Sequence, residues 1–222
     1  MTMHSNIFGY QYSWRDFADS KQGQIFTNDN KEDGEVNAVV VPASAGGGTV
    51  TFTAISSGTA AVIDYAPLGD YNFTLYQEKP MHHLNKVFGM QDIVIGVKEF
   101  DRRYIIKSNN ESATKSLLTD PDIRELIITQ DAADLRVLAP DSVFDPRWVV
   151  RHDHAVIAYH RNALMDKFDQ LEAVYRMLTG LVVQLQHLGF AHDAASAAVK
   201  SQHEPDEREA PRKLHSPLLD RN

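Results

Sequence analysis

The sequence predicts an α+β protein: an antiparallel β-sheet packed by a broken helix pair and a long C-terminal helix. Short segments rich in β-branched and aromatic residues, bounded by turn formers, occupy residues 36–77 and predict the sheet. Helix-capping residues recur within residues 108–121 and predict two short helices. Apolar residues at alternating spacings of four and three continue over residues 162–188, as expected for one long helix.

Composition limits the class of protein. The chain has 222 residues, of which 43% are hydrophobic and 23% charged, which is enough for one domain with a buried core. No apolar run approaches the roughly 18–20 residues of a membrane-spanning helix, and the first residues lack a secretion signal. The absence of cysteine excludes disulfides and thiolate chemistry, and a formal charge of −8 argues against nucleic-acid binding. We therefore expect a cytoplasmic protein without a membrane span or a cofactor.

Three parts are expected along the chain. Residues 1–34 form an aromatic segment and loop, residues 35–189 a single α+β domain, and residues 190–222 a disordered tail. The tail mixes both signs of charge and has too few large apolar residues to fold alone. Near its end, three leucines could form a short docking motif, although an unstructured terminus is the simpler expectation.

The aromatic segment contains Tyr10, Tyr12 and Trp14, which alternate at a period of two as in a strand before the chain can turn helical. Two interpretations stay open. The segment is either a docking strand for another molecule or an edge segment that covers the core of this same domain.

The first half of the domain is expected to contain three antiparallel strands, at residues 36–41, 49–55 and 71–77. The triple glycine at 46–48 links the first two as a hairpin-like connection. It lacks the lysine and serine or threonine of a phosphate-binding loop, and a strand rather than a helix follows it. Residues 64–70 have the composition of a turn.

The central stretch, residues 88–130, has the clearest local pattern. Phe100 to Arg103 alternates apolar and charged side chains, which predicts a half-buried strand on which Asp101 pairs with Arg103. Residues 108–111 supply several candidate caps for a helix. Asp120 followed by Pro121 predicts that a second helix starts there, so the helix restarts rather than continues.

The pattern IxxxxFDRRYIIKSNNE followed by KSLLTDPDIRELI resembles a family of uncharacterised bacterial domains, a domain of unknown function. In that family a Phe-Asp strand leads to a helix with a Leu-Leu end and a second short helix. The resemblance covers residues 88–189 and implies a fold and a bacterial origin, but no activity. Many of these relatives carry membrane helices beside the domain, and this sequence has none.

The metal candidate of the sequence is the triplet His152, Asp153 and His154. In a continuous strand the two histidines would share one face about 7 Å apart, and imidazoles suit zinc, copper or nickel. The alternative is a tight hairpin within residues 147–159 that has the triplet at its solvated tip. An enzyme, metal-dependent or acid–base, would act on a small molecule through His152 and His154, with Asp153 or His160; no catalytic residue is otherwise indicated.

The long C-terminal helix has two possible uses. Its apolar stripe is wider than a coiled-coil seam, which favours packing across the sheet, but a second face could bind a partner or another copy of the chain. In that case Leu178, Leu181 and Leu185 are the interaction residues. Because no catalytic constellation is evident, the sequence predicts a non-enzymatic interaction or regulatory domain with a protein partner or homo-oligomer through this helix.

Overall fold

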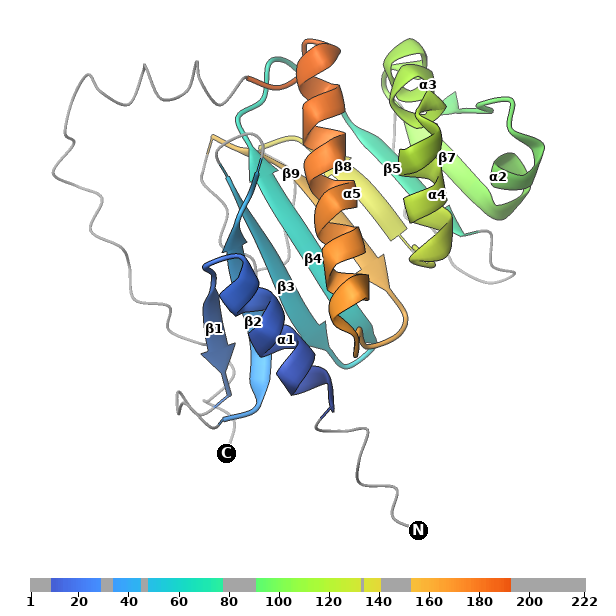
Figure 1. Cartoon of the computed structure of the whole chain (residues 1–222). Coiled ribbons are helices and arrows are strands. Elements are labelled where there is room, and N and C mark those ends of the chain that lie inside the picture. Colours follow the sequence, from blue (N-terminus) through green and yellow to red (C-terminus); the bar gives the residue numbers. More distant parts are fainter. Residues whose placement is uncertain are drawn as a thin grey trace, which may run out of the picture.

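A nine-stranded antiparallel sheet forms the centre of the molecule in the computed structural model (Figure 1). The structure describes residues 9–28, 34–44, 48–77, 91–132, 134–140 and 153–192. The strand order is β1-β2-β3-β4-β9-β8-β5-β7-β6. The strands are β1 Gln24–Thr27, β2 Val36–Pro42, β3 Thr49–Ile55, β4 Gly58–Tyr65, β5 Phe73–Gln77, β6 Gln91–Asp92, β7 Tyr104–Ser108, β8 Asp134–Leu138 and β9 Ala155–Arg161.

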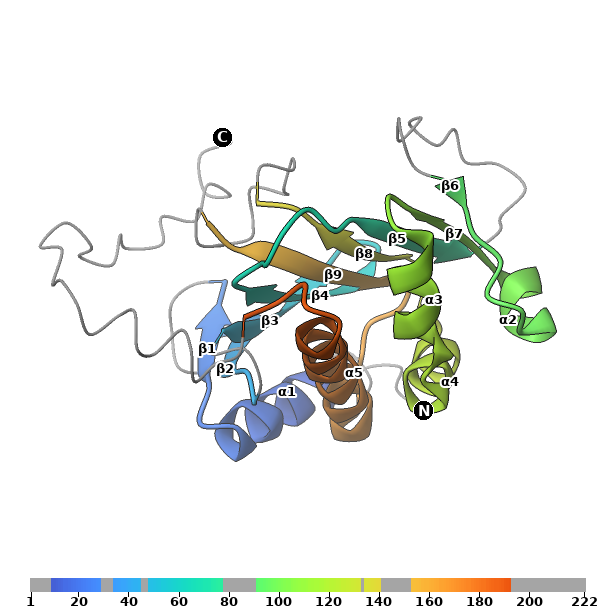
Figure 2. The same cartoon turned by 90° about the horizontal axis from the view of Figure 1, so that it is seen from above.

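Helices cover one face of this sheet, as the view from above shows (Figure 2). They are α1 Gly9–Ser20, α3 Glu111–Thr119, α4 Pro121–Thr129 and α5 Phe168–His187. A further short helix, α2 Lys98–Arg103, precedes β7 at one end of the sheet. The predicted α+β class, with a broken helix pair and a long C-terminal helix on an antiparallel sheet, is confirmed.

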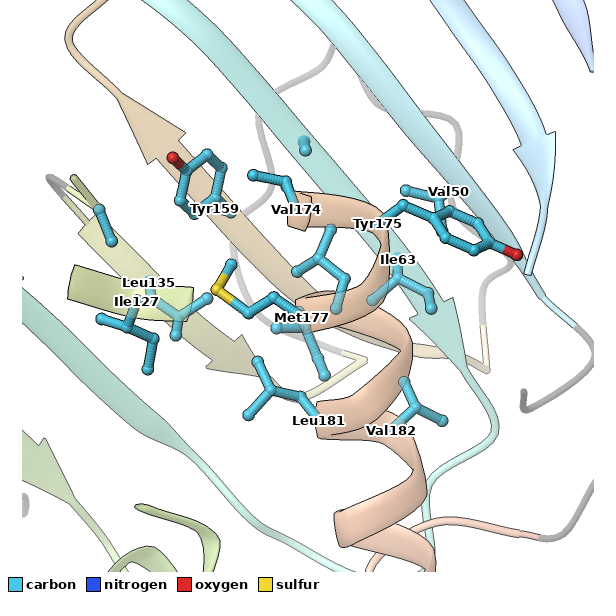
Figure 3. Packing of buried hydrophobic residues seen from close by; sticks show 14 of the residues in the cluster. Val50, Ile63, Ile127, Leu135, Tyr159, Val174, Tyr175, Met177, Leu181 and Val182 are labelled. Carbon is cyan, nitrogen blue, oxygen red and sulfur yellow. The ribbon is translucent and has the colours of Figure 1, made fainter. Parts of the chain in front are cut away.

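The core lies between α5 and the sheet. Val174, Met177 and Leu181 point from α5 toward side chains such as Ile63 and Leu135 on the strands (Figure 3). Their spacing of three and four residues places them on one side of the helix, as sheet packing requires.

The same packing corrects the predicted partner surface. Leu178, Leu181 and Leu185 are fully buried within this chain, so we assign them to its core in place of an interaction face. The wide apolar stripe covers several strands at once, which is why it exceeds a two-helix seam.

The N-terminal aromatic segment is a helix rather than the predicted strand. Tyr10, Trp14 and Phe17 are spaced by four and three residues and are buried on one face of α1, whereas Tyr12 is 71% exposed. The Trp14 indole N–H donates to the carbonyl of Met165 at 2.8 Å, which connects α1 to the segment just before α5. The core-covering interpretation is therefore the correct one.

Residues 9–28 also belong to the main domain, so the expected boundary at residue 34 is wrong. Strand β1 pairs antiparallel with β2 and forms one edge of the sheet. The sequence predicts a loop here from the polar run at residues 27–34, and it does not predict the four-residue strand β1.

A central strand was missed altogether. All eight residues of β4 are buried, and the strand pairs with β3 on one side and β9 on the other. Its sequence GTAAVIDY shows no alternation of apolar and polar residues because both faces of the strand are covered. Its last two residues, Asp64 and Tyr65, fall within the stretch that the sequence predicts to be a turn.

The strand predicted from Phe100 starts four residues later. Phe100 to Arg103 belongs to α2, and β7 begins at Tyr104. The Asp101 carboxylate accepts the backbone N–H groups of Ile95 and Gly96, at 2.9 Å each, and does not pair with Arg103. Arg103 instead donates to Asp131 at 2.6 Å.

The predicted helix starts are confirmed. The Asn110 side chain accepts the N–H of Ala113 at 3.0 Å and caps α3. Asp120 caps α4, with Pro121 in the first helical turn. Asp120 also accepts from the Gln184 side chain at 3.0 Å, which joins this break to α5.

The domain continues slightly beyond the expected end at residue 189. Gly189 has a φ of +78° and closes α5, and the Phe190 N–H donates to the carbonyl of Leu185 at 2.8 Å. The Phe190 ring then lies 4.9 Å from that of Tyr71, and Ala191 bridges to Pro67. The predicted disordered tail falls outside the described residues from position 193 onward.

Candidate functional site

The metal candidate from the sequence is only partly within the described residues. His152 lies outside them, and Asp153 is exposed. His154 is buried with 7% exposure, and its Nδ1 lies 2.8 Å from Oδ2 of Asp64. The expectation that His154 lies at a solvated hairpin tip is therefore wrong.

His154 directly precedes strand β9, which begins at Ala155. From Val156 to His160, β9 is bonded to β4 along one edge and to β8 along the other. The other arm of the predicted hairpin, residues 149–151, lies outside the described residues. In the described part of the chain, no three histidine, aspartate or glutamate side chains gather in a way that could hold a metal ion.

His160 has a neighbour that the sequence did not indicate. Its Nε2 lies 3.3 Å from Oγ of Ser57, on the turn between β3 and β4. Asp134 is directly opposite His160 in the register of β8 and β9. The Asp134 carboxylate is held by Arg136, whose Nε donates to it at 2.7 Å.

A cleft of about 640 Å³ opens beside this turn, at the ends of β3 and β4. We call it the Glu35 cleft. It is lined by Tyr10, Asn28, Glu35, Val36, Asn37, Ala54, Ile55, Ser56, Ser57, Gly58, Asn162, Ala163 and Leu164. Its walls thus come from α1, the start of β2, the β3–β4 turn and the segment after β9, which are far apart in the sequence.

A chain of hydrogen bonds fixes the carboxylate of Glu35. The Tyr10 hydroxyl donates to Oε1 at 2.9 Å and also lies 3.2 Å from the carbonyl of Val36. The Asn28 amide donates to Oε2 at 3.2 Å, and the Asn37 amide donates in turn to Asn28 Oδ1 at 2.9 Å. Each carboxylate oxygen therefore already accepts one hydrogen bond from within the chain.

The Tyr10 phenol keeps its proton. Burial, followed by the hydrogen bond and negative charge of Glu35, raises the pKa of Tyr10 well above its ordinary value. At neutral pH the hydroxyl is thus a fixed donor to Glu35 and not a proton-transfer group.

Backbone packing at Gly58 shapes the opposite wall. This residue has a φ of +143°, and a Cβ added there would lie 2.1 Å from the carbonyl oxygen of Arg161. The hydroxyl of Thr59 accepts the N–H of Met165 at 2.9 Å, which holds the segment that carries Asn162. Only glycine permits this close approach of the turn to residues 161–163.

The sequence did not identify this site. Apart from Tyr10 and Glu35, its polar residues are serines and asparagines, which are common in ordinary turns and carry no motif. In the sequence, Tyr10 stands out only as an aromatic residue, because its pairing with Glu35 spans 25 positions. No local spacing could have indicated it.

No protein-family model matches this sequence, and no curated protein matches it. Among solved structures, the chain is similar to the crystal structure of the mycobacterial trehalose monomycolate transport factor A, TtfA. The TM-score is 0.50 with 12% sequence identity, over 80% of this chain and 95% of that chain. This similarity is one of fold. The resemblance of residues 88–189 to uncharacterised bacterial domains stays a prediction. Among the described helices, none is long and apolar enough to cross a membrane.

Proposed function

We propose that this chain is a non-enzymatic binding module whose ligand occupies the Glu35 cleft. The observation that carries the proposal is the hydrogen-bonded chain Asn37–Asn28–Glu35–Tyr10. A carboxylate held by two internal donors, beside a phenol that stays protonated, is organised to present fixed hydrogen-bonding groups. It is poorly suited to exchanging protons with a substrate.

The size of the cleft supports a small ligand. Its volume of about 640 Å³ falls within the range of roughly 300–1,000 Å³ that is typical of small-molecule sites. The similar fold of a protein named as a transport factor also supports a role other than catalysis. The support is at the level of architecture, since sites differ among proteins that share a fold.

A second candidate function rests on Ser57 and His160. A serine hydroxyl beside an imidazole is the pairing that an acyl-transfer enzyme uses to activate its nucleophile. Here the two atoms are 3.3 Å apart, and the carboxylate opposite His160 is engaged by Arg136. We therefore favour binding over hydrolysis.

Amide chemical-shift mapping by NMR tests the proposal. The probes are glucose, N-acetylglucosamine, glucosamine, glucuronate and an uncharged, doubly capped glycine dipeptide. We expect at least one probe to shift the amide signals of Asn37, Ile55 and Asn162, and to be recovered unchanged. If no probe shifts these amide signals, the result would contradict the proposal. A chemically altered probe would favour an enzyme that uses Ser57 and His160.

A blocking variant and a matched control locate the binding. Asn162→Trp adds a large ring to an exposed wall position and should abolish the shifts without affecting the Glu35 hydrogen bonds. Val94→Trp makes a comparable addition at a 65% exposed position that does not line the cleft, and binding should persist. Equal binding by both variants would place the ligand elsewhere.

A further inference from the structure

We infer that the ligand of the Glu35 cleft is an uncharged polyhydroxylated molecule, a neutral sugar or sugar derivative. This inference rests on the proposed binding function and specifies its ligand class. It follows from three properties of the described lining residues: their hydrogen-bonding capacity, their charge and their apolar wall.

The polar groups that remain available both donate and accept. Within the described part of the chain, the side chains of Ser56 and Asn162 make no hydrogen bond, and both line the cleft. The Asn37 side chain donates from Nδ2 to Asn28, so its oxygen Oδ1 is not used in this hydrogen bond. Hydroxyls and amides combine donor and acceptor in one group, as sugar hydroxyls do.

The charges of the cleft disfavour ionic ligands. Among the described lining residues there is no lysine, arginine or histidine, so an anion would leave water without a compensating cation. The one charged group is the Glu35 carboxylate, and both of its oxygens already accept hydrogen bonds. A cationic ligand would have to share these oxygens with the Tyr10 and Asn28 groups that already donate to them.

The remaining wall is apolar. Ile55, Ala163 and Leu164 lie beside the polar groups, and Leu164 is 37% exposed. A sugar ring carries C–H groups on its faces and hydroxyls around its edge, so it matches a site with apolar and amide walls. The fixed Tyr10–Glu35 contact would keep this surface ordered before the ligand arrives.

An extended peptide fits the cleft less well, although it is also neutral and rich in donors and acceptors. Peptides commonly bind by adding a strand to an open sheet edge. Strand β3 is bonded to both β2 and β4, and β4 to both β3 and β9. Strands β3 and β4 therefore have no free edge for such pairing. Edge strand β1 does not line the cleft itself, since none of its residues, but only Asn28, which follows it, is among the lining residues.

Titration with three matched sugars tests the inference. N-acetylglucosamine is neutral, glucosamine carries an amine that can be protonated, and glucuronate carries a carboxylate. We expect N-acetylglucosamine to shift the cleft amides and to bind more tightly than either charged sugar. Ser56→Ala and Asn162→Ala should each weaken its binding about 2- to 12-fold, as the loss of one hydrogen bond does. Ser116→Ala, an exposed serine on α3, should leave it unchanged.

The outcomes separate the ligand class from the binding function. Tighter binding of glucosamine or glucuronate in the cleft would overturn the neutral-sugar inference and leave the binding module intact. Binding of the capped dipeptide there, without binding of any sugar, would do the same. Failure of every probe to shift the cleft amides would overturn both proposals.

Discussion

His154 and Asp64 form a buried pair that connects the end of β4 to the residue before β9, with Nδ1 2.8 Å from Oδ2. The other carboxylate oxygen of Asp64 accepts the backbone N–H of Thr49 at 2.9 Å. One side chain thus joins β3, β4 and the start of β9. The approach is close, because a Cβ added to Gly48 would lie 2.2 Å from the carbonyl oxygen of Asp64.

Removing this carboxylate should destabilise the sheet. Asp64→Ala removes the acceptor of the Thr49 N–H and leaves the imidazole of His154 buried without this partner. We expect a loss of about 2–4 kcal/mol in the free energy of unfolding, measured by urea denaturation. Asp134→Ala, which removes an exposed pair with Arg136, should cost about 0–1 kcal/mol. Equal losses of unfolding free energy in the two variants would show that the buried Asp64–His154 contact stabilises the fold no more than the exposed Asp134–Arg136 pair.

Replacing a buried leucine of α5 separates core packing from partner binding. Leu178 is fully buried, so Leu178→Ala should lower the free energy of unfolding by about 2–5 kcal/mol. The exposed Arg176, on the same helix, should tolerate alanine within about 0.5 kcal/mol. A stable Leu178→Ala protein with altered oligomeric state in light scattering would return this helix to a partner-binding role.

Two glycines with positive φ should respond differently to alanine. At Gly189 a Cβ meets no atom within 4 Å, so Gly189→Ala costs only backbone strain, about 1–2 kcal/mol. At Gly58 the Cβ would collide with the Arg161 carbonyl, at 2.1 Å, in addition to that strain. Thermal unfolding should therefore show the larger loss for Gly58→Ala. The reverse order would contradict the close approach that shapes the cleft wall.

Alkaline pH should weaken the fold through buried tyrosines. Burial raises the pKa of Tyr71 to about 12, although hydrogen bonds from Thr114 and Ser108 oppose the rise. The folded-state pKa lies above the unfolded value of about 10. The stability that protonated Tyr71 contributes to the fold is therefore fully present below about pH 10 and is lost as pH rises through about 12.

Comparison with a phenylalanine variant isolates Tyr71. Its hydroxyl lies 2.9 Å from that of Thr114, so Tyr71→Phe costs about 1 kcal/mol at neutral pH. Between about pH 8 and pH 11, however, the free energy of unfolding should fall less in Tyr71→Phe than in the unsubstituted protein. The difference, measured by urea denaturation, should be about 1 kcal/mol. Parallel pH profiles for the two proteins would mean that ionisation of the Tyr71 phenol does not lower the free energy of unfolding.

The helix starts could be predicted because their interactions are local. Asp120 caps the N–H groups of Asp122 and Ile123, and Asn110 caps that of Ala113, all within three positions. Likewise, β3 follows the triple glycine at 46–48 and is rich in β-branched residues, so its bounds were predicted as observed. These patterns need no knowledge of the rest of the fold.

Short or fully buried elements were decided by their surroundings. The four residues from Phe100 to Arg103 fit a strand or a helical turn equally well in sequence. The helical turn is stabilised by Asp101, which accepts the N–H groups of Ile95 and Gly96, and by the Phe100 ring, 4.9 Å from that of Tyr104. Strand β4 has no alternation to detect, because β3 and β9 flank it and both of its faces are covered.

The sequence by itself determined the fold class, the capped helix pair and the amphipathic closing helix, because periodicity and capping act over a few residues. Tertiary structure alone decided that Leu178 belongs to the core and that His154 meets Asp64 rather than solvent. It also assembled the Glu35 cleft from Tyr10, Glu35 and Asn162, which occupy distant positions in the chain. Such contacts depend on which strands become neighbours, and that is set by burial of the whole core rather than by any local pattern.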